Sequence, residues 1–411
     1  MNQTKPRSRL VVFTHAGGSP HHGPNMRWYY LGRALRAFGW SVEIVSASWF
    51  HKYNAPPQLE RTGPKQEIDG LIYHWMPSRR YDGHGFGQIL NQWDYTRKAW
   101  HLAGSAALAG TDVVIASSPH PFAFFPAWRL ARRSRATLLF ETRDLWPLAI
   151  RDLGSFNPLH PYIVLLGLVE RFAVRRADAL VSVKPGDWRY FNDRYGIEPT
   201  RQHYMPNGFL APAAQQGAES RQSSSEYRIG YVGALSNYYG LDCLLDAARL
   251  LRDKDFRFVI VGGGSDSGRL KAAAADLSKV EFVGPVPKHQ VPAMLSSIDL
   301  CYLGLKDIAA NRFGISCNKL FDYMAAAKPV LASYHTDYDP VEAANCGITV
   351  VPGDARAIAD AILWMHAHSA DALEMGRRGR SYFDAEHDFR HIAERYDRLL
   401  RSDFRPTIRK R

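Results

Sequence analysis

The apolar residues of the first half of the chain form short runs that alternate with stretches of helical periodicity. The runs are rich in β-branched side chains and predict buried parallel strands at residues 10–14, 41–47, 112–117, 137–141 and 179–183. The stretches between them predict helices over 25–38, 95–109, 122–133 and 161–176. Strand–helix alternation of this kind is typical of a doubly wound sheet.

A second series of the same kind follows residues 211–226, which are rich in Ala, Gln, Gly and Ser and predict a linker. Its strands are expected at 228–232, 256–261, 280–283, 300–304, 330–332 and 348–351. We therefore predict an α/β protein with two Rossmann-like doubly wound domains, 1–210 and 227–390, that face each other across a ligand-binding cleft. Residues 391–411 are expected to form a C-terminal helix and a basic tail, with the helix crossing back to the first domain.

The composition supports two domains and excludes several classes. A chain of 411 residues is too long for one ordinary core, and 46% hydrophobic with 22% charged residues describes a globular protein. The four cysteines have no metal-ligand spacing, so reduced thiols and no metal site are expected. Neither a signal peptide nor an apolar run of transmembrane length is visible, which predicts a cytoplasmic location. No cofactor is expected.

The net charge of +12 points to an anionic partner. No nucleic-acid-binding motif is present, so a phosphorylated ligand and an anionic membrane surface fit better. The stretches 25–38 and 161–176 combine apolar or aromatic residues with arginines, and predict that the first domain docks on the inner face of the cytoplasmic membrane. The tail residues Arg405, Arg409, Lys410 and Arg411 could add a tether. The alternative is that both helices pack on the sheet with their arginines in water.

The segment 314–330 has the strongest chemical signature. A loop with Ser316 leads into a short helix that begins near Asn318 and ends before Pro329. A helix N-terminus with Lys319 on its first turn suits a phosphate, and Asp322, one turn further, can accept hydrogen bonds from ribose hydroxyls. These residues predict a nucleotide-sugar site. The alternative is an ordinary loop and buried helix.

Several predicted strands end in glycines. Gly17 and Gly18 follow the first strand, and Gly233, with Asn237 further on, follows the first strand of the second domain. Gly263 ends the next strand, and Val286 lies in a Gly-Pro-Val-Pro elbow that could run along a nucleobase. Glycines at the carboxyl ends of strands let backbone amides approach a phosphate. None of them forms the dinucleotide fingerprint, and each alone could be a simple turn.

Polar residues also follow two apolar strands of the first domain. Arg143 and Asp144 come directly after residues 137–141, where charge is expensive unless it faces a ligand or forms a structural ion pair. His120 follows residues 112–117, and a loop histidine of this kind is more often simply exposed. We predict that Arg143 and Asp144 act on the donor sugar or the acceptor, with Lys319 as the third catalytic candidate and His120 as a binding residue.

The order of these blocks resembles a known family. The second half carries Tyr231-Val-Gly-Ala-Leu, Val261-Gly-Gly-Gly, Val283-Gly-Pro-Val-Pro and Lys319-Leu-Phe-Asp-Tyr-Met-Ala-Ala-Ala-Lys-Pro-Val. The first half carries Gly17-Gly18, Leu31-Gly-Arg-Ala-Leu, Arg143-Asp144-Leu-Trp-Pro147 and Met205-Pro-Asn-Gly208. Together they resemble retaining family-4 glycosyltransferases with the GT-B fold, in the branch that builds bacterial surface polysaccharides and often adds N-acetylated amino sugars. The resemblance implies a nucleotide-sugar donor, with UDP as the first guess, a lipid-linked or glycan acceptor, and no metal.

The chain departs from the family pattern at three positions. The first of the family's two acidic residues in this helix region falls on Gly314, whereas Asp322 falls on the second, ribose-binding one. Arg143 stands where the family has a histidine, and Tyr239 where it has a lysine. The diphosphate charge is then left to Lys319 with Arg312. A nucleotide-sugar epimerase or hydrolase of the same fold, or a non-catalytic glycan-assembly partner, remains the alternative.

Overall fold

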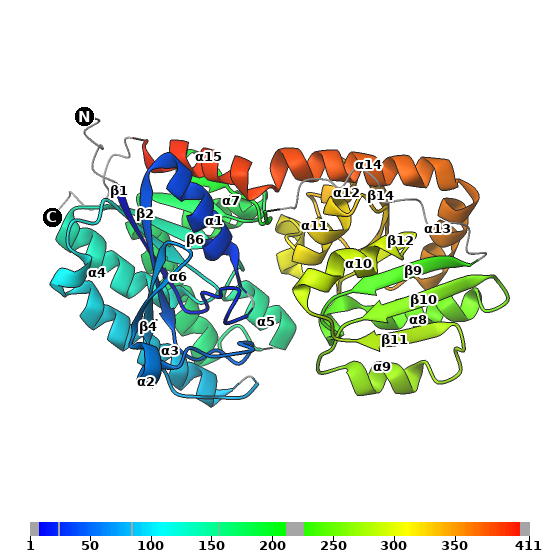
Figure 1. Cartoon of the computed structure of the whole chain (residues 1–411), viewed down its shortest axis with the longest axis horizontal. Helices are drawn as coiled ribbons and strands as arrows, with labels where there is room; N and C mark the ends of the chain where they lie inside the picture. The colour runs from blue at the N-terminus through cyan, green and yellow to red at the C-terminus, as the bar shows by residue number, and fades with distance from the viewer. Residues whose placement is uncertain (1–7, 24, 84, 155, 211–225, 403–411) are drawn as a thin grey trace. The chain divides into compact units, whose positions relative to one another are not determined.

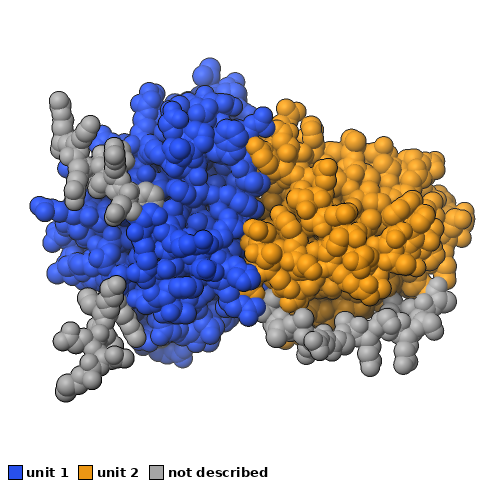
Figure 2. Space-filling model, turned by 90° about the horizontal axis from the view of Figure 1, so that it is seen from above, with its two compact units in different colours: residues 1–210, 389–411 blue, residues 211–388 orange. Residues whose placement is uncertain are grey.

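The computed structural model describes residues 8–23, 25–83, 85–154, 156–210 and 226–402, which form two compact units (Figure 2). Unit 1 comprises Met1–Leu210 and Phe389–Arg411, and unit 2 comprises Ala211–Asp388. Except for residue 226, the predicted linker lies outside the described residues, as does the basic tail from residue 403 onward. Each unit is a sheet covered by helices, so the prediction of two Rossmann-like doubly wound domains is confirmed.

Unit 1 contains an eight-stranded sheet in the order β3-β4-β2-β1-β5-β6-β7-β8, in which β3 alone runs antiparallel to its neighbour (Figure 1). The strands are β1 (Ser8–Thr14), β2 (Trp40–Ala47), β3 (Lys65–Ile68), β4 (Leu71–Met76), β5 (Val113–Ser117), β6 (Thr137–Thr142), β7 (Ala179–Ser182) and β8 (Gln202–Tyr204). The helices are α1 (Arg27–Leu35), α2 (Leu59–Thr62), α3 (Phe86–Ala103), α4 (Phe124–Ser134), α5 (Leu148–Gly154), α6 (Pro161–Arg176), α7 (Asp187–Tyr195) and α15 (Phe389–Leu400).

The order of strands determines where a ligand can bind in unit 1. The chain passes from β1 outward to β2 and β4, then returns to β5 on the other side of β1. The carboxyl ends of β1 and β5 therefore flank a topological switch point, where open α/β sheets bind their ligands. Both strands are buried, because their apolar runs are covered on both faces.

Unit 2 contains a six-stranded parallel sheet in the order β11-β10-β9-β12-β13-β14. Its strands are β9 (Tyr227–Val232), β10 (Phe256–Val261), β11 (Val280–Gly284), β12 (Leu300–Gly304), β13 (Val330–Ser333) and β14 (Gly347–Val350). Its helices are α8 (Leu241–Leu250), α9 (Ser267–Ala273), α10 (Val291–Ser296), α11 (Asn318–Ala325), α12 (Pro340–Ala343), α13 (Ala355–Ala367) and α14 (Ser369–Glu386). The switch point lies between β9 and β12.

The last helix, α15, packs on unit 1 although it follows unit 2 in the chain (Figure 1). Tyr396 of α15 lies edge-on to Trp28 of α1, with 5.7 Å between ring centroids. The indole N–H of Trp40 donates to Asp397 Oδ1 at 2.7 Å. The apolar stripe of α15, which includes Phe389 and Ile392, joins the core of unit 1.

The predicted membrane role of α1 is wrong. Trp28 and Tyr29 are 1% and 2% exposed, and Arg27 is buried beside Glu141. The aromatic residues of α1 therefore pack into the core of unit 1, between the sheet and α15. Among the helices of the described residues, none is both long enough and apolar enough to cross a membrane.

Candidate functional site

The glycine loops of unit 2 hold one another at the carboxyl edge of its sheet. A Cβ atom on Gly262 would lie 1.8 Å from the carbonyl oxygen of Gly233, so the loops can approach this closely only with glycine there. The Gly233 N–H donates to Val261 O at 2.9 Å, and the Leu235 N–H donates to Gly263 O at 2.9 Å. The Gly233 amide is therefore not free to bind a phosphate. Gly233 could contribute to the predicted phosphate site only by leaving room for the ligand, because it has no side chain.

Lys319 extends from the first turn of α11 onto these loops. A Cβ atom on Gly233 would lie 2.5 Å from Lys319 Cε, so the lysine stem covers this glycine directly. The ammonium donates to Tyr231 Oη at 2.6 Å and lies 2.9 Å from the centroid of the Tyr239 ring. Cys317, which precedes the helix, makes no capping hydrogen bond with its side chain. The helix N-terminus and the lysine thus present two positive groups at one place.

Burial changes the acid–base behaviour of Lys319. Loss of water lowers the pKa of Lys319 to about 7, while the charges of Cys317 and Asp322 act in the other direction. The neighbouring tyrosine rings stabilise a cation through their faces, but they do not neutralise it as a carboxylate would. An anionic ligand bound here would therefore supply the negative charge that balances the Lys319 ammonium.

Asp322 lies one turn further along α11 and is already engaged by a lysine. Both of its carboxylate oxygens accept hydrogen bonds from Lys288 Nζ, at 2.5 and 2.6 Å. Burial raises the pKa of Asp322, and the Lys288 charge opposes this shift. Lys288 follows the elbow that contains the half-buried Val286, so the structure brings this elbow and Asp322 together. A ribose that binds Asp322 would have to share or displace this ion pair.

The remaining predicted residues of unit 2 lie on short segments around this edge. The turn η5 (Asn237–Tyr239) is joined to η7 (Ala309–Phe313) by a hydrogen bond from Tyr238 Oη to Asn311 Oδ1 at 2.8 Å. This bond brings Asn237 and Arg312, both exposed, to neighbouring turns. Asn318 is exposed and Ser316 is half-buried.

In unit 1, Gly17 and Gly18 follow β1 at the switch point, but their amides are used within the protein. The Gly17 N–H donates to Ser46 Oγ at 2.8 Å, and the Gly18 N–H donates to Asn25 O at 3.2 Å. A Cβ atom on Gly17 would lie 3.1 Å from Ile44 Cγ2, so this glycine allows β1 and β2 to pack closely. Phosphate binding by these two amides remains a prediction that this hydrogen bonding disfavours.

Two histidine rings lie side by side where β1 and β5 end. The alternative that His120 is simply exposed is wrong: its exposed fraction is 1%, and its ring centroid lies 4.6 Å from that of His15. Its predicted binding role stays a prediction. Neither ring nitrogen of His120 has a hydrogen-bond partner among the residues that the structure describes. Burial, and then the neighbouring His15, keeps the pKa of His120 well below its usual value.

The tautomer of His15 follows from its partner. Asn91 donates both amide hydrogens, to Arg79 O at 2.6 Å and to Trp49 O at 3.2 Å. Its Oδ1 must therefore accept from His15 Nε2, which lies 2.5 Å away, so His15 carries its proton on Nε2. Burial lowers the pKa of His15 to about 4, and the pair of rings is neutral at physiological pH.

A buried ionic network lies under this edge. Glu141, the penultimate residue of β6, is fully buried and accepts from Arg27 at 2.9 Å, from Trp28 Nε1 at 2.9 Å and from Ser117 Oγ at 2.5 Å. Tyr396 of α15 also donates to it. Burial favours a higher pKa, but Arg27 and these donors outweigh it and lower the pKa of Glu141. A single carboxylate thus holds α1, β5, β6 and α15.

Arg143 and Asp144 directly follow β6, next to Glu141 of this network. The Arg143 backbone N–H donates to Ser118 Oγ at 2.8 Å, and its guanidinium reaches Asn25 Oδ1 at 3.4 Å. Arg143 Nε is buried without a hydrogen-bond partner, and burial lowers the Arg143 pKa. Asp144 is exposed, and the ion pairs among the described residues include none between the two. Neither side chain is held in an ion pair with the other, so both can contact a ligand. Their roles in catalysis remain predictions.

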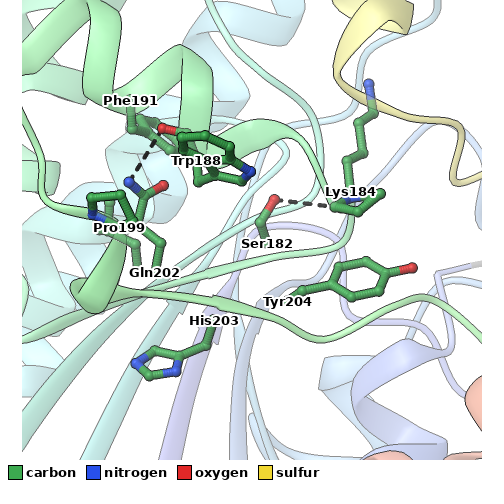
Figure 3. Close-up of a pocket in the computed structure, with 10 residues that line it drawn as sticks. Ser182, Lys184, Trp188, Phe191, Pro199, Gln202, His203 and Tyr204 are labelled. Atoms are coloured by element: carbon green, nitrogen blue, oxygen red, sulfur yellow. Dashed lines mark hydrogen bonds between the residues drawn. The ribbon is translucent and has the colours of Figure 1, made fainter. Parts of the chain in front are cut away.

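A small cavity of about 240 Å³ opens between β7, β8 and α7 (Figure 3). It is lined by Ser182 and Lys184 from the end of β7, Trp188 from α7, and His203 and Tyr204 from β8. Gln202 Nε2 closes one side by donating to Trp188 O at 3.3 Å. Its volume is below the several hundred Å³ typical of ligand sites, so it is too small for a nucleotide sugar.

Sequence reasoning missed several residues that shape these edges. Glu141 was visible as an acidic residue inside an apolar strand, which signals a buried ion pair. Lys288 and the Tyr231–Tyr239 pair gave no sequence signal, because each depends on the packing of segments that are distant in the chain. His15 was visible only as a histidine at the end of a strand.

Comparisons with known proteins give the family. Residues 22–208 match the model of a glycosyl transferase 4-like domain, and residues 226–368 match the model of glycosyl transferases group 1. A D-rhamnosyltransferase, WbpZ of Pseudomonas aeruginosa, is 32% identical over 228 residues, which are 53% of this chain and 57% of that protein. The chain therefore matches less than two thirds of this relative's length.

Solved structures are similar over nearly the whole chain. Sucrose-phosphate synthase from Thermosynechococcus elongatus has a TM-score of 0.72 at 17% identity, and the match covers 96% of this chain and 98% of the other. HepE from Anabaena in complex with UDP and glucose has a TM-score of 0.64 at 15% identity and covers 95% and 99%. At such identities the likeness shows the fold. The two domain models together match most of the chain, which belongs to the family-4 glycosyltransferases with the GT-B fold.

Proposed function

We propose that this protein transfers a sugar from a nucleotide diphosphate to a hydroxyl group of a lipid-linked or polysaccharide acceptor, with retention of anomeric configuration. Unit 2 would hold the donor nucleotide, and unit 1 would hold the acceptor. A lipid-linked acceptor would place the reaction at the inner face of the cytoplasmic membrane. The family assignment supports glycosyl transfer in general, whereas the donor, the acceptor and the stereochemistry are part of the proposal.

The observation that carries this proposal is the position of Lys319. A lysine buried to this degree without a carboxylate partner is costly, and such groups are found where function requires them. It lies on the glycine loops at the carboxyl edge of a parallel sheet and at a helix N-terminus, three features that each favour a phosphate. A nucleotide diphosphate supplies the missing negative charge and, through its ribose, the hydroxyl groups that Asp322 can bind.

The sugar-transfer reaction depends more on stabilising the charge that develops in the transition state than on a strong base. As the bond between the anomeric carbon and the diphosphate oxygen breaks, the sugar becomes oxocarbenium-like and the diphosphate gains negative charge. Lys319 and the N-terminal amides of α11 would stabilise that charge, and such preorganised groups usually make the largest catalytic contribution. The acceptor oxygen then forms the new bond, and its proton passes to a donor phosphate oxygen, as the family resemblance implies.

Unit 1 would orient the acceptor and the sugar. Arg143 and Asp144 are the charged candidates. His120 has two ring nitrogens without a hydrogen-bond partner among the described residues, but both are buried, so a sugar would reach them only if neighbouring side chains moved. A neutral imidazole can donate one hydrogen bond and accept another, which suits sugar hydroxyls. The low pKa of His120 means that it would act as a hydrogen-bonding group and not as a cation.

Two donors should be tested first. An N-acetylated amino sugar on UDP follows from the sequence resemblance, and UDP is bound in the HepE structure. A deoxyhexose donor is the second candidate, because WbpZ is named as a D-rhamnosyltransferase.

A screen of nucleotides and nucleotide sugars for thermal stabilisation of the full chain tests the proposal. A ligand at 100 times its Kd stabilises by about 2.7 kcal/mol, which such a screen detects easily. The donor that stabilises the protein should be consumed only when an acceptor is added. Release of free nucleotide at the same rate without an acceptor would replace the transferase with a hydrolase or epimerase. Absence of stabilisation by any nucleotide would contradict the proposal.

A further inference from the structure

Helix α6 has two apolar faces, one more than a surface helix needs. Ile163, Leu166 and Val169 are buried against the rest of unit 1. On the opposite side, Val164, Leu165 and Leu168 are 44%, 46% and 59% exposed. A helix that only covers a sheet keeps its outer face polar. The exposed apolar side chains on the outer face of α6 therefore indicate contact with an apolar partner.

The neighbouring segments extend this outer face. Leu153 at the end of α5 is 52% exposed, and Phe156 and Leu159, between α5 and α6, are 41% and 81% exposed. Together with Val164, Leu165 and Leu168, they concentrate six exposed apolar side chains in a short length of chain. We call these six residues the α5–α6 surface.

Helix α3 carries a second group of the same kind. Phe86, Ile89 and Trp93 are 73%, 37% and 64% exposed and lie at helical spacing on one face. The hydroxyl of Tyr162 donates to Gln92 Oε1 at 3.4 Å, so the first turn of α6 lies beside the turn of α3 that carries Trp93. Apart from Trp188, the large apolar side chains recorded as exposed within the described part of unit 1 all belong to α3 or to the α5–α6 surface.

Both helices become basic toward their C-terminal ends. Along α6 the exposed stripe continues from Val164 and Leu168 to Arg171 and Arg175, at spacings of four, three and four residues. Along α3 the stripe of Phe86 and Trp93 continues to the exposed Arg97. The apolar and cationic parts are therefore separated along each helix axis, in the same direction.

A groove of about 490 Å³ runs along this boundary on α6. It is lined by Val164, Leu168, Arg171 and Arg175 from α6 and by Arg194 and Tyr195 from α7. Its chemistry is half apolar and half cationic, like that of a lipid with an anionic head group and an acyl chain.

The acidic residues of α3, α5 and α6 themselves are already engaged. Glu170 is buried and accepts hydrogen bonds from Tyr190 and Tyr195, at 2.8 and 2.5 Å. Asp94 pairs with Arg79 at 2.7 Å, and Asp152 pairs with Arg151 at 2.8 Å. The exposed charges that α3 and α6 leave unengaged, those of Arg97, Arg171 and Arg175, are therefore positive and complement an anionic surface, although Asp193 of the neighbouring α7 is also exposed.

We propose that the α5–α6 surface, with the adjoining face of α3, docks the protein on an anionic lipid bilayer. The apolar side chains enter the boundary between head groups and acyl chains, and Arg97, Arg171 and Arg175 bind lipid phosphates. This proposal rests on the proposed function only in assuming that the acceptor is lipid-linked. It also moves the predicted membrane contact away from α1, whose aromatic side chains are buried.

Co-flotation of the full chain with vesicles tests the proposal without any sugar transfer. Phosphatidylcholine vesicles containing about one third phosphatidylglycerol should recover the protein at low salt, and pure phosphatidylcholine vesicles should recover far less. Recovery should fall as salt rises to a few tenths molar, because screening weakens the arginine contribution. Equal recovery in the unbound fraction with both vesicles at low salt would overturn the proposal.

Two double variants separate the apolar and cationic contributions. Arg171→Gln with Arg175→Gln should weaken binding to anionic vesicles by roughly 25-fold, since each arginine is worth about fivefold. Leu165→Gln with Leu168→Gln should weaken binding at least about tenfold, with little effect on folding because both side chains are half exposed. The matched control, Leu250→Gln with Leu373→Gln on unit 2, removes leucines that are 47% and 52% exposed and should leave binding unchanged.

Other outcomes would identify a different occupant or a different error. If the wild type is a dimer and the leucine variant a monomer, and neither floats, the surface is an interface between two copies and the docking proposal is wrong. An equal loss in the control variant would also contradict it. Loss of vesicle binding with intact UDP binding leaves the proposed function standing, whereas vesicle binding without nucleotide binding would reject the proposed function and keep the docking surface.

Discussion

The carboxyl edges of the two sheets have similar topology and different electrostatics. In unit 2 a buried lysine lies against glycine loops and a helix N-terminus, and no carboxylate of the described residues forms an ion pair with it. In unit 1 two neutral histidine rings lie buried at the corresponding edge, and the carboxylate Glu141 is buried there in an ion pair with Arg27. Sheets whose central strands follow a similar order therefore support an edge suited to a diphosphate and an edge suited to neutral hydroxyl groups.

This difference explains why unit 2 is the better candidate for the nucleotide. A buried cation next to backbone dipoles gains most from a ligand with several negative oxygens. Neutral imidazoles gain little from charge but can exchange hydrogen bonds with a sugar. The predictions that follow break the comparison at one edge or the other.

The largest effect is expected from Lys319→Ala. Loss of the only charged group that covers Gly233 in the described structure should lower kcat by about 10²–10³-fold, because the charge it stabilises grows in the transition state. Steady-state kinetics with saturating donor measure this. If kcat is unchanged and only KM rises, Lys319 contributes to ground-state binding alone.

Arg143→Ala tests the edge of unit 1. We expect turnover to fall by more than tenfold while the melting temperature stays within a degree or two, because Arg143 makes one long side-chain hydrogen bond and forms no ion pair with Asp144. Arg143→Lys is the matched control, since it keeps the charge without the planar fork. Loss of stability with normal specific activity would show that Arg143 is structural.

The pH dependence of nucleotide affinity sharpens the contrast. The cationic form of Lys319 binds the diphosphate, and its pKa in the free protein is about 7. Affinity for UDP should therefore be fully present below pH 7 and fall by up to about tenfold per pH unit above it, until the pKa of the bound state is passed. Calorimetry between pH 6.5 and 9 checks this, and Lys319→Ala should flatten the profile. A flat wild-type profile would mean that Lys319 keeps its charge without the ligand.

A smaller effect should separate function from stability at the same residue. The folded-state pKa of Lys319 lies below the unfolded value, so the charged lysine costs stability below the unfolded pKa, and this cost disappears as pH rises. Lys319→Met should thus raise the melting temperature of unit 2 at pH 7 by roughly 2–4 °C per kcal/mol recovered, while it abolishes activity. Calorimetric melting of both forms at pH 7 and pH 9 should show the gain shrinking at the higher pH.

The smallest effect concerns Asp322 and its partner. Asp322→Asn should raise the donor KM about tenfold with little change in kcat, because a ribose contact is made equally in the ground and transition states. Lys288→Ala should change the donor KM less than threefold, since Lys288 is more than half exposed. A larger effect in Lys288→Ala than in Asp322→Asn would reverse the roles of the two residues.

The sequence predicted the two doubly wound sheets because buried parallel strands are continuous apolar runs, which are visible without a structure. Strands β3 and β4 escaped notice, since β3 is a short polar edge strand and pairs antiparallel with β4. Packing of α1 on the sheet was only the alternative to membrane docking. The burial of Arg27 could not be predicted, because its partner Glu141 is 114 positions away. Local sequence patterns predict individual helices and strands. Ion pairs between residues that are distant in the chain depend on the whole fold.

The candidate site was predictable in outline but not in its electrostatics. Lys319 and Asp322 stand out as polar residues at the start of a helix that follows a glycine loop. That Lys319 would be buried between Tyr231 and Tyr239, and that Lys288 would occupy Asp322, depends on side chains from three separate segments. The burial of His120 was likewise decided by the packing of β1 against β5 and not by its own neighbours.

The central claim is that the glycine loops and Lys319 of unit 2 hold the diphosphate of the donor. Isothermal titration of the full chain with UDP and with UMP tests this most directly, because the two ligands differ by one phosphate. We expect UDP to bind at least about tenfold more tightly than UMP in the wild type, and this preference to disappear in Lys319→Ala while UMP affinity changes little. A Lys319→Ala variant that keeps the wild-type preference for UDP would contradict the account.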